Sequence, residues 1–269
     1  MKLNMISPRP LEPAPLGRLI LMPNTLDLGY EAHPLELVLP QQVIQQAAQL
    51  RHWVVENAKT TRAFLKRVQA LVPLCVPLQE MHIQEIPKPV KGQTTPQTHN
   101  ITMTPAIRAL LQPLQQGHDV GLLSEAGLPA VADPGSAVVA LAHELGASVL
   151  PHSGPNSLML ALAASGLHGQ CFAFVGYLPQ DHALRAARIK QREQRSHQER
   201  ETQILIETPY RNQAVFSALL ENLNSTTLLS VACGLTLASG WAQTKSIKDW
   251  KSALVYFEKG LPCVFSFLA

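Results

Sequence analysis

Short apolar runs alternate with amphipathic segments over the first two thirds of the chain. Five such runs are typical of buried strands: residues 17–23, 53–56, 120–123, 148–150 and 171–176. The segments between them predict helices at residues 40–50, 59–70, 136–145 and 157–165, with a further helix ending at Gln116. Gly146 and Gly166 close two of these helices as C-cap glycines. Repeated strand-loop-helix units predict a mostly parallel sheet in an α/β fold.

A second α/β domain is expected after the turn Tyr177-Leu178-Pro179. It begins with a long polar helix at residues 181–200. The remaining elements are strands at 203–207, 227–233 and 263–267 and helices at 209–222 and 247–258. We therefore expect two domains, 1–178 and 179–269. Residues 83–100 are rich in Pro, Lys, Gln and Thr, and predict a long exposed loop.

Three Gly/Pro loops follow apolar runs in the first domain. They read Ser124-Glu125-Ala126-Gly127-Leu128-Pro129, Ala132-Asp133-Pro134-Gly135 and His152-Ser153-Gly154-Pro155-Asn156-Ser157. In open α/β sheets ligands bind at such turns, because glycine admits a close approach to the backbone and helix N-termini present unpaired N–H groups. These loops predict a binding site for a nucleotide-like ligand.

The order of these loops resembles the tetrapyrrole methylase superfamily, most closely its branch of small-subunit ribosomal RNA ribose 2′-O-methyltransferases. That branch has Ser-Asp-Ala-Gly-Thr-Pro, Asn-Asp-Pro-Gly, Pro-Gly-Pro and Gly-Phe-Leu-Pro in the same order, the last matched here by Gly176-Tyr177-Leu178-Pro179. The resemblance is strong over residues 117–179 and weak over the first hundred. It implies two α/β domains of the tetrapyrrole methylase type with the cofactor cleft between them.

The cofactor that the resemblance implies is S-adenosylmethionine. A methyl transfer from a sulfonium asks the protein mainly to align donor and acceptor and to exclude water. The binding candidates therefore act largely through main-chain groups. They are Pro23, Glu125, Ala126, Gly127, Gly154, Pro155, Ser157, Ile206, Gly234 and Leu235. Glu125 stands where the relatives have Asp, and either binds a ligand amine or hydroxyl or caps a turn. Asp133 is interpreted as a turn residue.

A ribose 2′-hydroxyl acceptor needs a group that takes its proton or lowers its pKa. His99 is the first candidate, because His99-Asn100 matches the end of the relatives' His-x-His-Asn. Glu56 and Arg62 match the relatives' Ala-Glu-Asp-Thr-Arg with extra residues between them, and Lys59 and Glu207 are further candidates. The residues alone do not choose among these.

Four arginines recur at steps of three and four in the polar helix that follows the turn Tyr177-Leu178-Pro179. They are Arg185, Arg188, Arg192 and Arg195. This spacing puts them on one helix face. Arg185, Arg188 and Arg192 are our candidates for binding RNA phosphates, as the relatives have a basic segment here. The alternative is a solvated helix face balanced by Glu193 and Glu199.

Charge and composition limit the partners and the cellular location that are expected. The net charge of +3 and the pI near 8.7 permit a nucleic-acid partner without demanding one. The four cysteines have no metal-ligand spacing and predict buried, reduced thiols. The longest apolar run is too short to span a bilayer. We therefore expect a cytoplasmic protein without a metal or membrane partner. The resemblance implies ribosomal RNA as partner and a homodimer.

Two other functions stay open. One is a tetrapyrrole or other small-molecule methyltransferase, which a deep apolar cleft without arginines would favour. The other is a catalytically silent paralogue that binds RNA or a protein through the arginine-rich helix.

Overall fold

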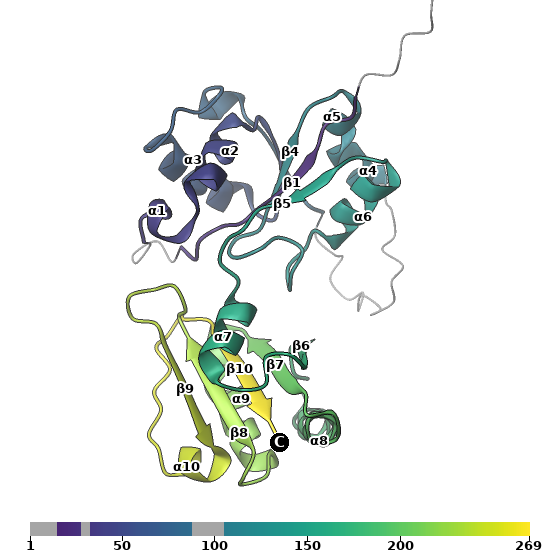
Figure 1. The fold of residues 1–269 in the computed structure, drawn as a ribbon. Coiled ribbons are helices and arrows are strands. Elements are labelled where there is room, and N and C mark those ends of the chain that lie inside the picture. Colours follow the sequence, from purple (N-terminus) through teal and green to yellow (C-terminus); the bar gives the residue numbers. More distant parts are fainter. Residues whose placement is uncertain (1–14, 28–32, 88–104) are drawn as a thin grey trace, which may run out of the picture. The chain divides into compact units, whose positions relative to one another are not determined.

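A computed structural model describes residues 15–27, 33–87 and 105–269 as two compact units (Figure 1). Of these residues, the first unit contains 15–23, 41–87, 105–125 and 129–153, and the second contains 24–27, 33–40, 126–128 and 154–269. The boundary expected from the sequence, between residues 178 and 179, falls inside the second unit. The chain thus enters the second unit twice before its last long passage there.

The first unit is a five-stranded parallel sheet in the order β3-β2-β4-β1-β5. Its strands are β1 (Leu19–Met22), β2 (His52–Val55), β3 (His82–Glu85), β4 (Val120–Leu123) and β5 (Val149–Pro151). Its helices are α2 (Gln41–Gln49), α3 (Ala58–Gln69), α4 (Pro105–Leu110), α5 (Gln112–Gln115) and α6 (Ser136–Glu144), with a 3₁₀ turn at Leu78–Glu80. The parallel sheet expected from the strand-loop-helix pattern is confirmed.

Apolar residues from sheet and helices form the core of this unit. Every residue of the central strand β4 is buried, as expected for a parallel strand covered on both faces. Leu122 of β4 belongs to one buried cluster with Leu111, which precedes α5, Leu114 of α5 and Leu141 of α6. On β4, Gly121 leaves room for the Trp53 ring, because a Cβ at Gly121 would lie 2.7 Å from Trp53 Cε3.

The second unit is a five-stranded mixed sheet in the order β6-β7-β10-β8-β9. Its strands are β6 (Phe172–Gly176), β7 (Thr202–Glu207), β8 (Leu228–Cys233), β9 (Trp241–Ser246) and β10 (Cys263–Leu268). Only β6 and β7 pair in parallel, and the other pairs are antiparallel. Its helices are α1 (Leu35–Val38), α7 (Ser157–Ser165), α8 (His182–Glu199), α9 (Asn212–Asn222) and α10 (Ile247–Lys251), with a 3₁₀ turn at Pro209–Arg211.

Capping residues explain where two of these helices begin. The Asn156 side chain accepts from the N–H groups of Leu158 and Met159 and starts α7, and Gly166 ends it with a φ of 66°. Asp181 accepts from Leu184 N–H and starts α8. The expected helices at 157–165 and 181–200 are therefore confirmed to within a residue or two.

Three sequence-based expectations were wrong. Residues 83–85 belong to strand β3 and not to a loop. Strand β9 was missed, because it lies at the edge of a sheet and has four polar residues after Trp241 and Ala242, with no apolar run. The helix expected at 247–258 ends at Lys251. Beyond it Leu254 and Tyr256 are exposed, whereas Val255 and Phe257 pack on the core, and this alternation has the period of an extended chain.

No helix in the described ranges is long and apolar enough to cross a membrane. All four cysteines are free thiols. Cys233 and Cys263 are buried as expected, whereas Cys75 is exposed and Cys171 is half-buried, so the prediction of buried thiols was wrong for these two.

Candidate functional site

Polar side chains gather where strands β2 and β4 of the first unit end. Because the two strands are parallel and in register, the residues that follow them meet at the carboxyl edge of the sheet. Glu125 N–H donates to Glu56 Oε2 at 3.0 Å, and the Asn57 side-chain amide donates to Glu125 Oε1 at 2.9 Å. The same Asn57 side chain caps α3 by accepting from Lys59 N–H at 2.9 Å. The predicted residues Glu56 and Glu125 are thus brought together.

Asp133 is the third carboxylate of this cluster. Burial raises its pKa to about 6, and the charges of Glu56 and Glu125 add to the rise, while a hydrogen bond with Ser124 opposes it. Sequence reasoning treated Asp133 as a turn residue. Its proton affinity depends on the approach of Glu56 from another strand, which the local sequence Asp-Pro-Gly does not reveal. An acid of this pKa exchanges a proton readily near neutral pH.

The backbone around Asp133 is unusual. Ala130 and Ala132 both have a φ of 65°, the left-handed region that residues with a Cβ seldom adopt. Gly135 has a φ of 134°, and a Cβ there would lie 3.2 Å from Leu122 Cδ2 and 3.4 Å from Ala130 N. Such strain persists where the surrounding structure fixes it, and it concentrates at functional sites.

Two further predicted residues of this unit, Arg62 and Pro23, have no hydrogen bond to the acidic cluster in the described part of the chain. The Arg62 guanidinium donates to the carbonyl of Ala58 in its own helix at 3.4 Å. No hydrogen bond joins Arg62 to Glu56 among the residues that the structure describes. Pro23 is buried just after β1. His99 lies outside the described residues.

In the second unit, Gly127 is held by a two-hydrogen-bond bridge to Asn24. Asn24 N–H donates to Gly127 O, and Gly127 N–H donates to Asn24 O, both at 2.9 Å. Gly127 has a φ of 75°, and a Cβ there would lie 3.6 Å from Pro155 O. The glycine is therefore needed for its backbone conformation more than for space. Ala126 precedes it and is half-buried.

Two further segments of the second unit meet at a groove of about 520 Å³. Gly154 and Pro155 contribute from the loop before α7, and Thr236 and Leu237 contribute from the turn after β8. The walls are completed by His33, Leu37, Val38 and Leu160. Ser157 is exposed at the first position of α7, and Asn156 performs the capping.

The remaining predicted residues support this turn. Gly234 has a φ of 59° and donates to Pro262 O at 3.0 Å, and its carbonyl accepts from Leu237 N–H at 3.0 Å. Ile206 and Leu235 pack against the same buried cluster as Leu158 and Leu162 of α7. The turn that begins at Gly234 is thereby fixed in place beside α7.

The groove suits an adenosine-type group. Its volume lies within the range of about 300–1,000 Å³ that is usual for small-molecule sites. Apolar side chains can cover a base, while main-chain groups at Gly154 and Pro155 and the Thr236 hydroxyl can hydrogen-bond polar edges. The residues present therefore fit the nucleoside half of S-adenosylmethionine.

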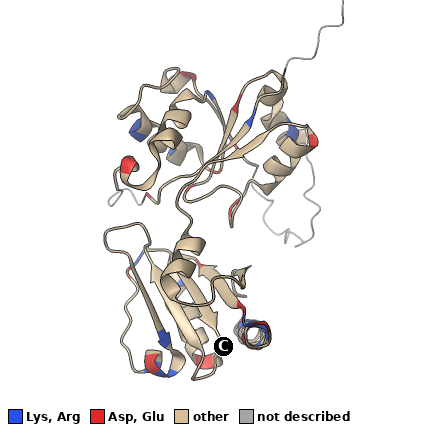
Figure 2. Cartoon of the chain, in the orientation of Figure 1, with Lys and Arg blue, Asp and Glu red and all other residues tan. Residues whose placement is uncertain are grey.

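Helix α8 carries basic and acidic residues (Figure 2). Its four arginines have different partners. Arg185 donates to the carbonyl of Gln180 at 2.8 Å, and Arg195 donates to the Glu201 carboxylate at 2.8 and 3.2 Å. Arg188 donates to the Gln191 side chain at 2.7 Å. Burial lowers the pKa of Arg192, and the charges of Arg188 and Arg195 add to this effect. The Arg192 Nε atom is buried and has no partner in the described part of the chain.

These contacts bear on both interpretations of the helix. Glu193 does not balance the arginines, because it is buried and accepts from Asn224 N–H at 2.7 Å and from the Thr227 hydroxyl at 2.5 Å. That part of the solvated-face alternative was wrong. Arg188, Arg192 and Arg195 line a groove of about 460 Å³ together with glutamines and Glu199.

Asn57 and Asp133 are the residues of the acidic cluster that the sequence did not single out. The only signal for Asn57 was its place as a helix-capping residue between a strand and a helix. Asp133 stands before Pro-Gly in the loop that follows the first Gly/Pro loop, but ordinary turns have the same sequence, so it does not indicate a proton acceptor.

Comparisons with known proteins come from sequence and from structure. The chain is 34% identical over 173 residues to Ribosomal RNA small subunit methyltransferase I of Synechocystis sp., which covers 63% of this chain and 59% of that protein. It is 42% identical over 98 residues to the protein of the same name from Pseudomonas aeruginosa, with coverage of 36% and 33%. For the Bacillus subtilis protein of that name the identity is 32% over 142 residues, with coverage of 53% and 46%. The matched part of the chain thus spans less than two thirds of each relative.

Among solved structures, the methyltransferase CobJ superposes with a TM-score of 0.55 at 14% identity, over 93% of both chains. Diphthine synthase superposes with a TM-score of 0.52 at 12% identity, over 93% of this chain and 89% of that one. No family model matches the sequence.

Proposed function

We propose that this chain, which has the α/β fold of the tetrapyrrole methylase superfamily and a sequence similar to Ribosomal RNA small subunit methyltransferase I, is an S-adenosylmethionine-dependent methyltransferase of an RNA ribose 2′-hydroxyl. The resemblance drawn from the Gly/Pro loops is confirmed by these relatives.

One observation carries it: the groove on which Gly154 and Pro155 meet the turn from Gly234 to Leu237. These segments are far apart in the sequence, and both were expected to bind the cofactor. Gly127, also expected to bind the cofactor, lies next to Pro155 of this groove. In this proposal Leu37, Val38, Leu160 and Leu237 exclude water from the nucleoside, and backbone groups orient it.

S-adenosylmethionine would supply a methyl group on a sulfonium centre, a donor that carries its own leaving group. The chain therefore has to hold the acceptor hydroxyl and receive its proton. Asp133 is our proposed proton acceptor, because a carboxylate with a pKa of about 6 is ionised at neutral pH and more basic than an ordinary aspartate. Glu56 and Glu125 are positioning residues in this scheme, since their charges help to set that pKa.

Arg188 and Arg192 are our proposed contacts to RNA phosphates, and Arg185 is a weaker candidate because its guanidinium is bound to the carbonyl of Gln180. Phosphate contacts of this kind would position the substrate without selecting its sequence. A homodimer, as implied by the resemblance, is part of the proposal as well.

The test is calorimetric titration of the full chain with S-adenosylmethionine and S-adenosylhomocysteine. Leu160→Trp places an indole in the groove, and Met159→Trp is a matched control on the neighbouring exposed position of the same helix, which does not line the groove. We expect micromolar binding that Leu160→Trp weakens at least tenfold and Met159→Trp leaves within about twofold.

Absence of binding in the wild type, or equal loss in both variants, would contradict the proposed cofactor site. If binding is found, methyl transfer to unmodified ribosomal RNA is assayed with Asp133→Asn. Activity that persists at the wild-type level in this variant would remove Asp133 as proton acceptor.

A small-molecule methyltransferase is the second candidate. The observation that favours it is the lining of the 520 Å³ groove, whose walls contain apolar residues and no arginine or lysine. Cofactor binding together with failure to methylate any RNA would select this function.

A further inference from the structure

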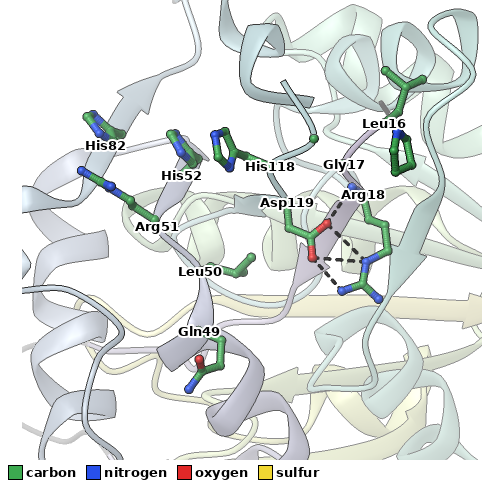
Figure 3. Close-up of a pocket in the computed structure, with 12 residues that line it drawn as sticks. Leu16, Gly17, Arg18, Gln49, Leu50, Arg51, His52, His82, His118 and Asp119 are labelled. Carbon is green, nitrogen blue, oxygen red and sulfur yellow. Dashed lines mark hydrogen bonds and ion pairs between the residues drawn. The ribbon is translucent and has the colours of Figure 1, made fainter. Parts of the chain in front are cut away.

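A second concave site lies at the amino edge of the first sheet, the edge opposite to the acidic cluster. It is a pocket of about 650 Å³ whose polar lining includes Arg18, Arg51, His52, His82, His118 and Asp119 (Figure 3). None of these residues was a candidate for the methyltransferase site.

The parallel register explains why these side chains meet. His52 and His82 are the first residues of β2 and β3 and are direct partners in the sheet. His118 precedes Val120, which is the partner of His52 on the other side. The imidazole rings therefore form a row, with centroids 4.9 Å apart between His52 and His82 and 5.1 Å apart between His52 and His118.

The cations of the pocket outnumber its carboxylate. The Arg51 guanidinium makes no hydrogen bond or ion pair within the described ranges, and its charge disfavours the charged form of the His52 ring. Asp119 is the single carboxylate of the lining, and Arg18 occupies it with contacts of 2.6 and 3.2 Å. Arg51 therefore gives the site a net positive charge, which increases when a histidine ring is protonated.

The floor of the pocket is rigid. Gly17 lies so close to the chain at His118 that a Cβ would be 1.9 Å from His118 O. Asp119 also accepts from the Arg18 backbone N–H at 2.8 Å, and His82 N–H donates to Arg51 O at 3.0 Å. The residues that carry the cations are thus joined by close contacts of their backbone.

We propose that this pocket binds the phosphodiester backbone of single-stranded RNA, as a second contact that anchors the substrate away from the methylated nucleotide. Phosphate oxygens match the N–H groups of arginine and protonated imidazole. The choice of RNA over other phosphates rests on the proposed function.

Protonation links the site to pH. Burial lowers the pKa of His52, and the charges of His82, His118 and Arg51 add to this effect. The groups that face the row are Arg51, Arg18 and Asp119, of which the last two neutralise each other. A bound phosphate favours the charged rings, so binding strengthens as pH falls through the histidine range.

The experiment measures binding of a fluorescein-labelled single-stranded oligoribonucleotide to the full chain by anisotropy, at about pH 6 and about pH 8 and over a series of KCl concentrations. The double variant Arg51→Gln/His82→Gln changes two exposed side chains of the pocket. Lys66→Gln/His143→Gln removes the same kinds of charge from exposed positions on α3 and α6 and is the matched control.

We expect the pocket variant to bind about tenfold more weakly at pH 6, with a smaller loss at pH 8, and the slope of log K against log salt to fall by roughly 1.4 for two lost phosphate contacts. The control variant stays within about twofold of the wild type. Unchanged binding in the pocket variant, or an equal loss in the control, would overturn the proposal.

NMR of the imidazole Cε1–H signals separates the two sources of phosphate. Shifts of the His52, His82 and His118 signals on adding RNA support the proposal, whereas shifts with inorganic phosphate and none with RNA would overturn it in favour of a small ligand. Calorimetry with S-adenosylmethionine on the pocket variant keeps the two proposals separable, because this variant should retain wild-type cofactor binding.

Discussion

The carboxyl edge of the first sheet gathers carboxylates, whereas the amino edge of the same sheet gathers arginines and histidines. Glu56, Glu125 and Asp133 meet at one edge, and Arg18, Arg51 and the histidine row meet at the other. Both clusters arise because parallel strands in register bring equivalent positions side by side. The difference teaches that one short sheet can offer a proton acceptor at one edge and an anion site at the other.

The largest expected effect comes from Gly17, whose missing side chain lets the backbone lie against His118 at the amino edge of the sheet. In Gly17→Ala the new Cβ would overlap the His118 carbonyl, so we expect a loss of about 3 kcal/mol or more in the free energy of unfolding. The measurement is urea unfolding followed by circular dichroism.

Gly169→Ala is the control for this change, because a Cβ at Gly169 meets nothing within 4 Å and its φ is not in the left-handed region. We expect it to change stability by less than about 0.5 kcal/mol. Equal stability of the two variants would refute the close approach at the amino edge.

Asn57 tests how the carboxyl edge is held together. Asn57→Ala removes the cap of α3 and the amide that bonds Glu125, so we expect a loss of about 1–2 kcal/mol in the free energy of unfolding. Asn57→Asp keeps a capping oxygen but adds a negative charge beside Glu125, and its loss should be larger at pH 7 than at pH 5.

Asn156→Ala provides the comparison for Asn57, since Asn156 caps α7 in the second unit. We expect a loss of about 1 kcal/mol that does not depend on pH. A pH-independent deficit in Asn57→Asp would mean that the acidic cluster does not feel the added charge.

Asp133 gives a smaller effect with a defined sign. Its pKa is about 6 in the folded chain, above its ordinary value of 3.8, so the folded state binds the extra proton between these values. The stability from this proton is present below about pH 4 and is lost as pH rises through 6. We expect about 1 kcal/mol, after allowing for solvent screening of a partly exposed carboxyl.

The check is urea unfolding of the wild type and Asp133→Asn at several pH values between 4 and 7.5. The variant should lack the decline that the wild type shows between about pH 4 and pH 6. Parallel curves for the two proteins would show that Asp133 titrates normally.

The smallest expected effect is on RNA binding and comes from Asp119 at the amino edge of the sheet. Burial alone would raise the pKa of Asp119, but the hydrogen bonds and charge of Arg18 outweigh this and lower it, so Asp119 is ionised and cancels Arg18. Asp119→Asn keeps an oxygen for the Arg18 backbone N–H while freeing the guanidinium. We expect RNA to bind about threefold more tightly, measured by anisotropy. Weaker binding would mean that Arg18 needs Asp119 for its position.

The sequence predicted the fold well where strands are continuous apolar runs. Strands such as β4 are buried on both faces, so their residues are apolar throughout and easy to find. Strand β9 at a sheet edge and the short helix α10 were missed or misjudged, because neither has a full apolar face. Local composition is a weak guide where burial is partial.

The candidate site was predictable in its glycines and prolines and less so in its charges. Gly127, Gly135 and Gly234 have positive φ values, which is why the loops need these residues. The pKa of Asp133 and the histidine row depend on which strands become neighbours, and no local motif encodes the order β3-β2-β4-β1-β5.

The second sheet has its last-made strand in the middle. Strand β10 pairs with β7 on one side and with β8 on the other, although it follows both in the chain. During synthesis the pairs β6-β7 and β8-β9 therefore have no strand between them. The inner edges of β7 and β8 stay unpaired until β10 has been synthesised. Deleting residues 263–268 should leave a chain prone to aggregation through those edges, and the sheet should complete its folding only after β10 has been synthesised.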